Sequence, residues 1–135
     1  MALAGRCSQK RCFVLIAEDD DDDRMIFEES LGELARGVDF AFVKNGQELI
    51  DFLSAERSLP DIIFLDLNMP LMDGRDALKL IRSDPKLKDI PVVCFTTSSS
   101  VDDRRLCLEH GAVFHTKPAR ISEFYELIES QLGLL

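Results

Sequence analysis

The sequence has no long apolar run and no apolar leader. Its longest apolar runs, such as 13–17, have about five residues, whereas a helix that spans a membrane needs about 20. Residues 1–11 are mixed in character and lack the apolar middle of a secretory signal peptide. These absences predict a cytoplasmic protein that has no membrane partner.

Basic residues are fewer than acidic ones. The 135 residues include 16 lysines and arginines against 25 acidic residues, which leaves a formal net charge of −9 at pH 7. Such a surface would repel a phosphate backbone, so we expect no nucleic-acid partner. The length is typical of one domain with a sizeable core, and the hydrophobic fraction of 46% is typical of a folded protein rather than a disordered one.

The sequence also lacks the paired cysteines of a zinc or thiol-redox motif. Its four cysteines, Cys7, Cys12, Cys94 and Cys107, include no C-x-x-C pair. Cys12 and Cys94 lie in apolar runs, where a reduced thiol behaves as a small hydrophobic side chain. We therefore expect inert thiols in a reducing compartment.

No internal repeat, low-complexity linker or change of composition divides the chain. We predict one domain at 12–132, preceded by an extension at 1–11 and followed by a tail at 133–135. Short apolar runs alternate with amphipathic segments, which is the pattern of βα units around a parallel sheet. The predicted strands are Cys12–Glu18, Val38–Val43, Asp61–Asp66, Pro91–Thr96 and Ala112–Thr116. The predicted helices are Asp23–Ala35, Asn45–Ala55, Asp73–Arg82, Val101–His110 and Ile121–Leu132.

This order of elements fits the flavodoxin-like α/β fold, a doubly wound (βα)5 domain with a five-stranded parallel sheet. The expected strand order, 2-1-3-4-5, is that of known folds of this class. Polar residues predict where helices begin: Asn45 is placed to cap one helix, and Ser100 is spaced from Asp103 as in a capping pair. Gly111 and Gly133 are placed to end the last two helices.

In open α/β sheets, ligands bind beyond the carboxyl ends of the strands. The first predicted strand ends at Glu18 and Asp19, and the third ends at Asp66. The fourth ends at Thr96, and the fifth is followed by Lys117. One edge of the sheet is therefore expected to gather three carboxylates, a hydroxyl and an ammonium group.

Such a group of carboxylates needs a cation. Two carboxylates about 4 Å apart repel by about 4 kcal/mol at an effective dielectric constant near 20. Few carboxylates, a backbone carbonyl and retained waters suit Mg²⁺ better than Ca²⁺, with Mn²⁺ as an alternative ion. Asp21, Asp22 and Asp23 continue the acidic run, and we expect them to be solvated residues favoured by the helix dipole.

Several segments resemble the receiver-domain family of two-component response regulators. They are 14–19, the stretch 61–74, Thr96 and Lys117-Pro118. The most specific part is Asp66-Leu67-Asn68-Met69-Pro70-Leu71-Met72-Asp73-Gly74, and the four segments follow one another in the family's order. The resemblance extends over most of the chain, from about Cys12 to Leu132.

The resemblance implies a role for each matching residue. Asp66 would accept a phosphoryl group and become an acyl phosphate. Asp19 and Asp66 would bind Mg²⁺ directly, Glu18 would bind it through a water, and Asn68 would bind it through its backbone carbonyl. Lys117 would supply a second positive charge to the phosphoryl group, and Thr96 a hydrogen bond. The resemblance also implies a cis peptide bond at Lys117–Pro118.

Further positions are assigned by counting from these residues. Asn68 and Ser98 lie two residues beyond the aspartate and the threonine, and would tune hydrolysis of the acyl phosphate. Thr96 and Phe114 would form the conformational switch, with the ring turning inward as Thr96 moves. The turn from Gly111 to Lys117 is one residue shorter than is usual in the family. This difference affects the assignment of Phe114 as the aromatic switch residue, because that assignment counts back from Lys117.

The resemblance implies a stand-alone response regulator, because only about 18 residues follow Lys117. A sensor histidine kinase or a phosphotransfer protein would phosphorylate it, and it would signal by phosphorylation-dependent binding of a protein target that the sequence does not identify. A homodimer is an alternative assembly. We expect output from the face formed by 101–110, 112–116 and 121–132, and the strand-end residues resemble receivers that partner bacterial phytochrome-type kinases.

Three other functions fit the same fold or the same nucleophile. A flavodoxin-type cofactor binder needs a phosphate cradle after the first strand, but this chain has a block of aspartates there. A haloacid-dehalogenase-type phosphatase needs a second aspartate two residues after the nucleophile, where this chain has Asn68. A degenerate receiver would act only as a binding scaffold. We therefore expect self-phosphorylation and self-dephosphorylation chemistry, not a turnover enzyme.

Overall fold

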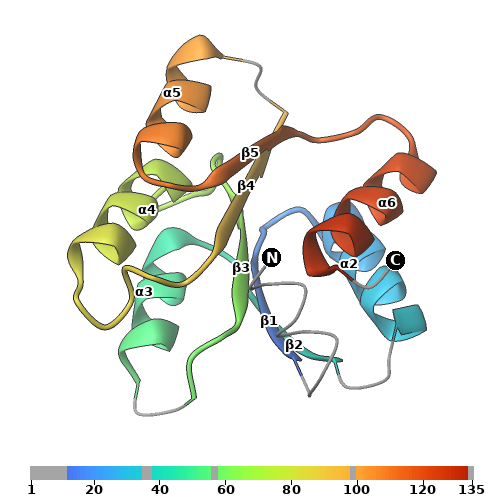
Figure 1. Ribbon diagram of the computed structural model, residues 1–135. Helices are drawn as coiled ribbons and strands as arrows, with labels where there is room; N and C mark the ends of the chain where they lie inside the picture. Colours follow the sequence, from blue (N-terminus) through green and yellow to red (C-terminus); the bar gives the residue numbers. More distant parts are fainter. Residues whose placement is uncertain (1–11, 35–37, 56–57, 98–99, 134–135) are drawn as a thin grey trace.

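The computed structural model describes residues 12–34, 38–55, 58–97 and 100–133, and in this part of the chain strands and helices alternate regularly (Figure 1). The elements in chain order are β1 (Cys12–Ala17), α2 (Asp21–Leu34), β2 (Val38–Val43), α3 (Gly46–Ser54), β3 (Ile62–Asp66), α4 (Gly74–Ser83), β4 (Val92–Thr96), α5 (Val101–Glu109), β5 (Val113–Thr116) and α6 (Ile121–Leu132).

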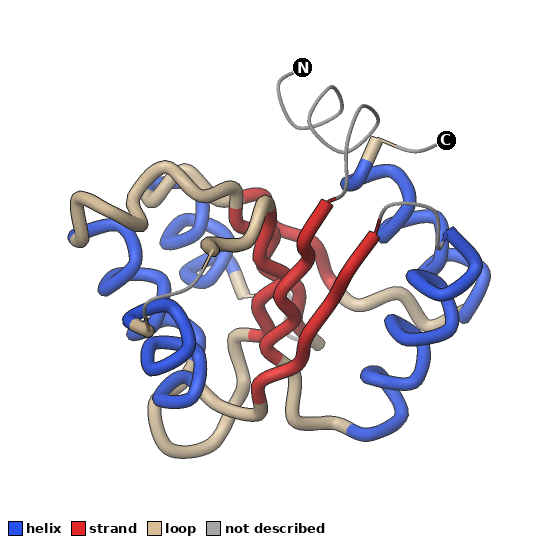
Figure 2. The backbone as a smooth tube through the Cα atoms, turned by 90° about the horizontal axis from the view of Figure 1, so that it is seen from below, coloured by secondary structure: helices blue, strands red, loops and turns tan. Residues whose placement is uncertain are grey.

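The five strands form one sheet of order β2-β1-β3-β4-β5, and every adjacent pair is parallel. Helices cover both faces: α3, α4 and α5 lie on one side, and α2 and α6 lie on the other (Figures 1 and 2). The predicted flavodoxin-like fold and its strand order are confirmed. None of the helices in the described ranges is long and apolar enough to cross a membrane.

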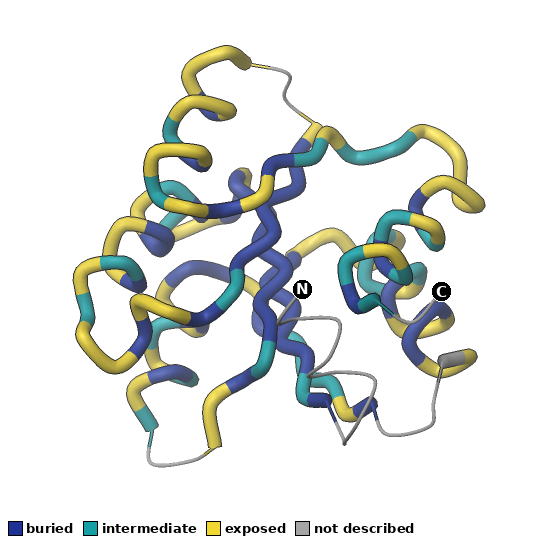
Figure 3. Tube along the Cα trace, viewed as in Figure 1, coloured by how far each residue is buried: buried dark blue, intermediate teal, exposed yellow. Residues whose placement is uncertain are grey.

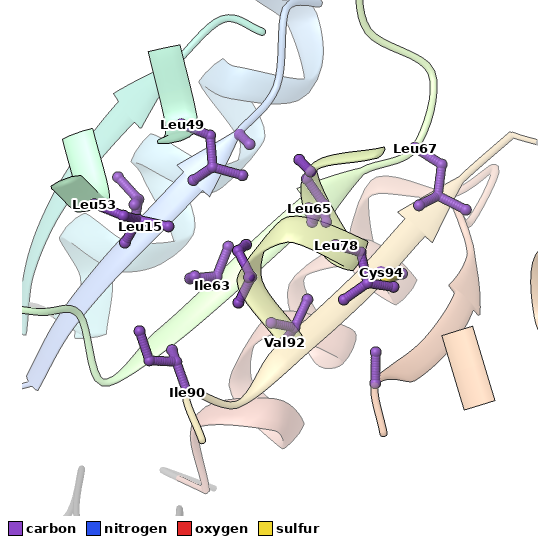
Figure 4. Packing of buried hydrophobic residues seen from close by; sticks show 14 of the residues in the cluster. Leu15, Leu49, Leu53, Ile63, Leu65, Leu67, Leu78, Ile90, Val92 and Cys94 are labelled. Atoms are coloured by element: carbon purple, nitrogen blue, oxygen red, sulfur yellow. The ribbon is translucent and has the colours of Figure 1, made fainter. Parts of the chain in front are cut away.

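Alternate residues of the central strands pack into two cores, one on each face of the sheet. Leu15, Ile63 and Cys94 belong to the core beneath α3, α4 and α5 (Figure 4). The other core, beneath α2 and α6, is aromatic: the ring of Phe27 lies 5.1 Å from that of Phe64, with Phe95 and Phe124 at similar distances. The strands are therefore buried on both faces, which explains their nearly continuous apolar runs (Figure 3).

The predicted caps are confirmed at the N-termini of α3 and α5 and at the C-terminus of α6. The side chain of Asn45 accepts a hydrogen bond from the Glu48 amide, and that of Ser100 accepts from the Asp102 and Asp103 amides. Gly133 ends α6 in the left-handed conformation, with φ 69°.

The first helix begins at Asp21, two residues before the predicted start at Asp23. The difference is explained by Asp20, whose Oδ1 accepts hydrogen bonds from the amides of Asp22 and Asp23. A carboxylate in this position satisfies amides that have no partner within the helix, so the aspartate run itself starts the helix.

Two glycines hold the loop between β3 and α4 close to its neighbours. The Gly46 amide donates to the Met72 carbonyl at 2.8 Å, and the Gly74 amide donates to the Leu67 carbonyl at 3.0 Å. A Cβ atom would lie 2.2 Å from the Met72 oxygen at Gly46 and 2.4 Å from the Asp66 backbone oxygen at Gly74. Only glycine permits these approaches, which fix the course of the loop that follows Asp66.

Two further expectations, on the peptide bond before Pro118 and on the cysteines, are wrong. The described residues contain no cis peptide bond, so the bond between Lys117 and Pro118 is not cis. Cys94 and Cys107 are buried free thiols, as expected, but Cys12 is in a disulfide. Cys7 lies outside the described residues.

Candidate functional site

The carboxyl ends of β1 and β3 bring three carboxylates together, as the sequence predicts. Glu18, Asp19 and Asp66 each offer an oxygen, and these oxygens all lie within 4.8 Å of one another. Glu18 and Asp66 are buried, with 0% and 3% of their surface exposed, whereas Asp19 is exposed. Two buried carboxylates beside a third require positive charge nearby.

Lys117 supplies that charge from the loop after β5. Its amide donates to the Thr96 carbonyl at 2.7 Å, which extends the pairing of β4 and β5 and aims the side chain across the sheet edge. Nζ lies 2.7 Å from Glu18 Oε1 and 3.2 Å from Asp66 Oδ2. The shortened turn before Lys117 therefore still delivers the ammonium to Asp66.

Asp23 also contacts this lysine, which the sequence analysis did not predict. Its Oδ2 lies 2.7 Å from Lys117 Nζ, and its side chain is 20% exposed. Asp21, at 92% exposure, is solvated as expected. Asp23 faces inward because α2 begins early and turns its third residue toward β5, so the prediction of a solvated residue is wrong here.

The site perturbs two of its own ionisable groups. Burial raises the pKa of Glu18 to about 8, and the neighbouring Asp66 carboxylate adds to this effect. Burial lowers the pKa of Lys117, but the Asp23 and Glu18 carboxylates more than offset it, so that the net shift is upward. The lysine therefore stays charged, while Glu18 is poised to hold a proton when no cation other than Lys117 is near.

Asn68 joins the end of β3 to the end of β4. The backbone N–H of Asn68 donates to Asp66 Oδ1 at 3.0 Å, and its side-chain Nδ2 donates to Thr96 Oγ1 at 2.7 Å. Thr96 is fully buried, so its hydroxyl lies at the strand end beneath this contact. The predicted residues Asn68, Thr96, Asp66 and Lys117 are thus brought together. Ser98 lies outside the described residues.

The donor set suits a hard divalent cation. The oxygens come from carboxylates, and the Asn68 backbone is held against Asp66, so that its carbonyl is in the adjoining loop. Within the described part of the chain, Glu18 Oε1 is a buried oxygen that accepts no aligned hydrogen bond, although the lysine ammonium is close. A buried carboxylate oxygen of this kind fits a metal-bound water or a metal ion.

Phe114 lies in the core rather than at the surface. It is 8% exposed and packs with the cluster beneath α3, α4 and α5. The guanidinium of Arg104 lies 5.2 Å from its ring centre. The ring therefore already points into the core in this structure. The expected inward turn of Phe114 would need a ring that starts at the surface.

Comparison with known proteins agrees with the arrangement of these residues. A family model for the response regulator receiver domain matches residues 14–129. The chain belongs to this family. Receiver domains are signalling proteins of two-component systems; they bind a divalent metal and interact with histidine kinases and downstream targets.

Among relatives by sequence, the receiver is 31% identical over 121 residues to the probable methanogenesis regulatory protein FilR2 of Methanothrix harundinacea, covering 86% of this chain and 78% of that protein. It is 30% identical over 122 residues to response regulator Rcp1 of Synechocystis, covering 86% and 83%.

Solved structures give the same family. The phosphorylated cyanobacterial phytochrome response regulator RcpA superposes with a TM-score of 0.84 at 32% identity, over 89% of this chain and 90% of that one. The Mn²⁺-bound form of Rcp1 also gives 0.84, at 28% identity, over 91% and 93%. The predicted family is confirmed, and its phytochrome-associated members are among the relatives.

Proposed function

We propose that this receiver accepts a phosphoryl group on Asp66 in a Mg²⁺-dependent reaction and signals by binding a protein in the phosphorylated state. One observation carries the proposal: Lys117 Nζ lies 3.2 Å from Asp66 Oδ2, at the edge of the sheet where Glu18 and Asp19 also lie. A nucleophilic carboxylate, a metal-binding group and a fixed ammonium are the parts that phosphoryl transfer needs.

These positions support the following reaction. A carboxylate oxygen of Asp66 attacks phosphorus, the bond to the donor breaks, and the donor leaves with that bond's electron pair. A phosphorylated histidine of a sensor kinase or phosphotransfer protein is the expected donor. Lys117 neutralises charge on the phosphoryl oxygens as they move, and Thr96 donates a hydrogen bond to one of them. Bound Mg²⁺ would supply the remaining positive charge. Glu18, Asp19, Asp66 and the Asn68 carbonyl would bind the ion.

Two relatives support this chemistry. RcpA is described in its phosphorylated form, and Rcp1 in its Mn²⁺-bound form. We propose Mg²⁺ as the ion here, with Mn²⁺ as a substitute. Turnover of phosphate esters is disfavoured because Asn68 occupies the position of the acid–base aspartate, and an amide acts neither as an acid nor as a base at neutral pH.

We propose that the signal leaves through the face formed by α5, β5 and α6, which lie at one edge of the sheet (Figure 1). Thr96 ends β4 beside this face, and its hydroxyl now accepts from Asn68. Drawing that hydroxyl toward a phosphoryl group breaks the contact and alters packing around Phe114. A protein target is the expected partner, because Val101, Leu108, Val113 and Ile121 are exposed there.

Incubation with acetyl phosphate and Mg²⁺ distinguishes the candidate functions. A phosphoacceptor gains one phosphoryl group per chain and releases phosphate slowly. A phosphatase would release phosphate continuously at a rate set by enzyme concentration, with little label retained. A degenerate receiver would take up nothing, and that result would overturn the proposal.

A further inference from the structure

Arg75, the second residue of α4, joins the phosphoryl site to α5. Its guanidinium makes a two-pronged contact with Asp103 on α5: Nε donates to Oδ1 at 2.6 Å and Nη2 donates to Oδ2 at 2.7 Å. Asp103 is buried, with 6% of its surface exposed, and its carboxylate is the largest influence that raises the pKa of Arg75. This planar pairing fixes the plane and the position of the guanidinium.

The same guanidinium reaches back to the loop after Asp66. Nη1 donates to the Leu67 carbonyl at 3.2 Å, and Nη2 donates to Asn68 Oδ1 at 3.3 Å. The other end of that amide, Nδ2, donates to Thr96 Oγ1 at 2.7 Å. One hydrogen-bonded chain therefore runs from Asp103 through Arg75 and Asn68 to Thr96.

Arg75 determines which end of the Asn68 amide faces Thr96. Because the guanidinium can only donate, it selects the carbonyl oxygen of the amide and leaves the NH₂ group for Thr96. Without Arg75 this selection is lost, and the amide can rotate so that its oxygen takes the place of Nδ2 on the Thr96 side of the site. An oxygen in that place accepts a hydrogen bond from a water and orients it for attack on the phosphoryl group.

We propose that Arg75 is a positioning residue that holds the Asn68 amide in its slow-hydrolysis orientation, and that Asp103 on α5 acts on the phosphoryl lifetime through Arg75. The inference rests on the proposed function, because it needs a phosphoryl group on Asp66. It also gives a partner that binds α5 a route to the active site: moving Asp103 changes the Asn68 amide.

The first experiment needs no phosphoryl group. The side-chain amide signal of Asn68 is identified in a ¹H–¹⁵N NMR spectrum by its loss in Asn68→Ala. We expect this signal to move in Arg75→Met, in Arg75→Lys, which keeps the charge but not the fork, and in Asp103→Asn. It should stay in place in Arg105→Met, which removes an exposed arginine from α5. An unmoved signal in Arg75→Met or Asp103→Asn overturns the positioning role.

The second experiment measures loss of label from protein phosphorylated with acetyl phosphate and Mg²⁺. We expect hydrolysis about two- to tenfold faster in Arg75→Met and in Asp103→Asn, the effect of about one hydrogen bond, and an unchanged rate in Arg105→Met. The double variant Arg75→Met/Asp103→Asn should hydrolyse no faster than Arg75→Met alone. Multiplying effects in the double variant, or unchanged rates in both single variants, overturn the proposal.

The two experiments separate a failure of the Arg75 positioning role from a failure of the proposed function. A wild type that takes up no label contradicts phosphoacceptance by Asp66 and the lifetime role together, while the amide signal still decides whether Arg75 orients Asn68. If Arg75→Met fails to fold, Arg75→Lys and Asp103→Asn provide the same comparison.

Discussion

Asp23 Oδ2 lies 2.7 Å from Lys117 Nζ, although 94 residues separate the two in the sequence. Together with Glu18 and Asp66, this places three carboxylates around one ammonium. Lys117 is therefore held beside Asp66 by carboxylates that, in the proposed reaction, compete with the phosphoryl group for its charge.

Replacing Asp23 by Asn tests this contact. We expect the free energy of unfolding to fall by roughly 0.2–1 kcal/mol relative to Asp22→Asn, because the ion pair is partly exposed. Asp22 is exposed and lies in the same acidic run, so its variant removes the same charge without touching the lysine. Urea unfolding gives both values. Equal stability of the two variants would show that the contact contributes nothing.

Mg²⁺ should stabilise the protein through the carboxylates. An ion bound only by the native state adds about 2.7 kcal/mol at a concentration of 100 Kd. Thermal unfolding should therefore show a higher Tm with Mg²⁺ in the wild type and a much smaller rise in Asp19→Asn, while Asp21→Asn keeps the full rise. The same rise in Asp19→Asn and the wild type would place the ion elsewhere.

Glu18 should give the metal-free protein a distinctive pH dependence. Its pKa is raised from the usual 4.5 to about 8, so the folded state binds the proton more tightly than the unfolded state. The stability that this proton binding contributes is fully present below about pH 4.5 and is lost as the pH rises through about 8. With a chelator present, the unfolding free energy of the wild type should decline across this window more steeply than that of Glu18→Gln. Parallel pH profiles would refute this.

Arg82 should stabilise the end of the molecule opposite the site. Its guanidinium donates to the carbonyls of Lys88 and Ile90 at 3.0 and 2.8 Å, and to that of His110. Arg82→Met leaves these acceptors without their donor, so we expect a loss of roughly 1–3 kcal/mol of unfolding free energy. Lys79→Met, an exposed change in the same helix, should cost far less. Comparable losses would mean that the carbonyl contacts are dispensable.

The sequence predicted the parts of the site that lie at strand ends. The places of Glu18, Asp66 and Thr96 follow from the topology alone, because parallel strands bring their carboxyl ends to one edge. Asp23 and Arg75 were not predicted because their positions depend on where a helix begins and how it turns. A capping carboxylate at Asp20 would have been the signal for Asp23, since it starts the helix early.

The fold itself was predictable because the central strands are covered on both faces and so show as apolar runs. Phe114 shows the limit. Its place on β5 was predicted, but counting back from Lys117 carries no information on whether the ring points inward. That depends on the space beneath α5 and on Arg104, which packs over the ring.

The most direct test of the central claim is the intact mass of the protein after incubation with acetyl phosphate. With Mg²⁺, the wild type should gain the mass of one phosphoryl group, and a chelator should prevent the gain. Asp66→Asn should gain nothing under the same conditions, and Asp19→Asn should gain little because metal binding is weakened. Full labelling of Asp66→Asn would contradict the assignment of Asp66, and full labelling of the wild type in the chelator would contradict the requirement for a metal.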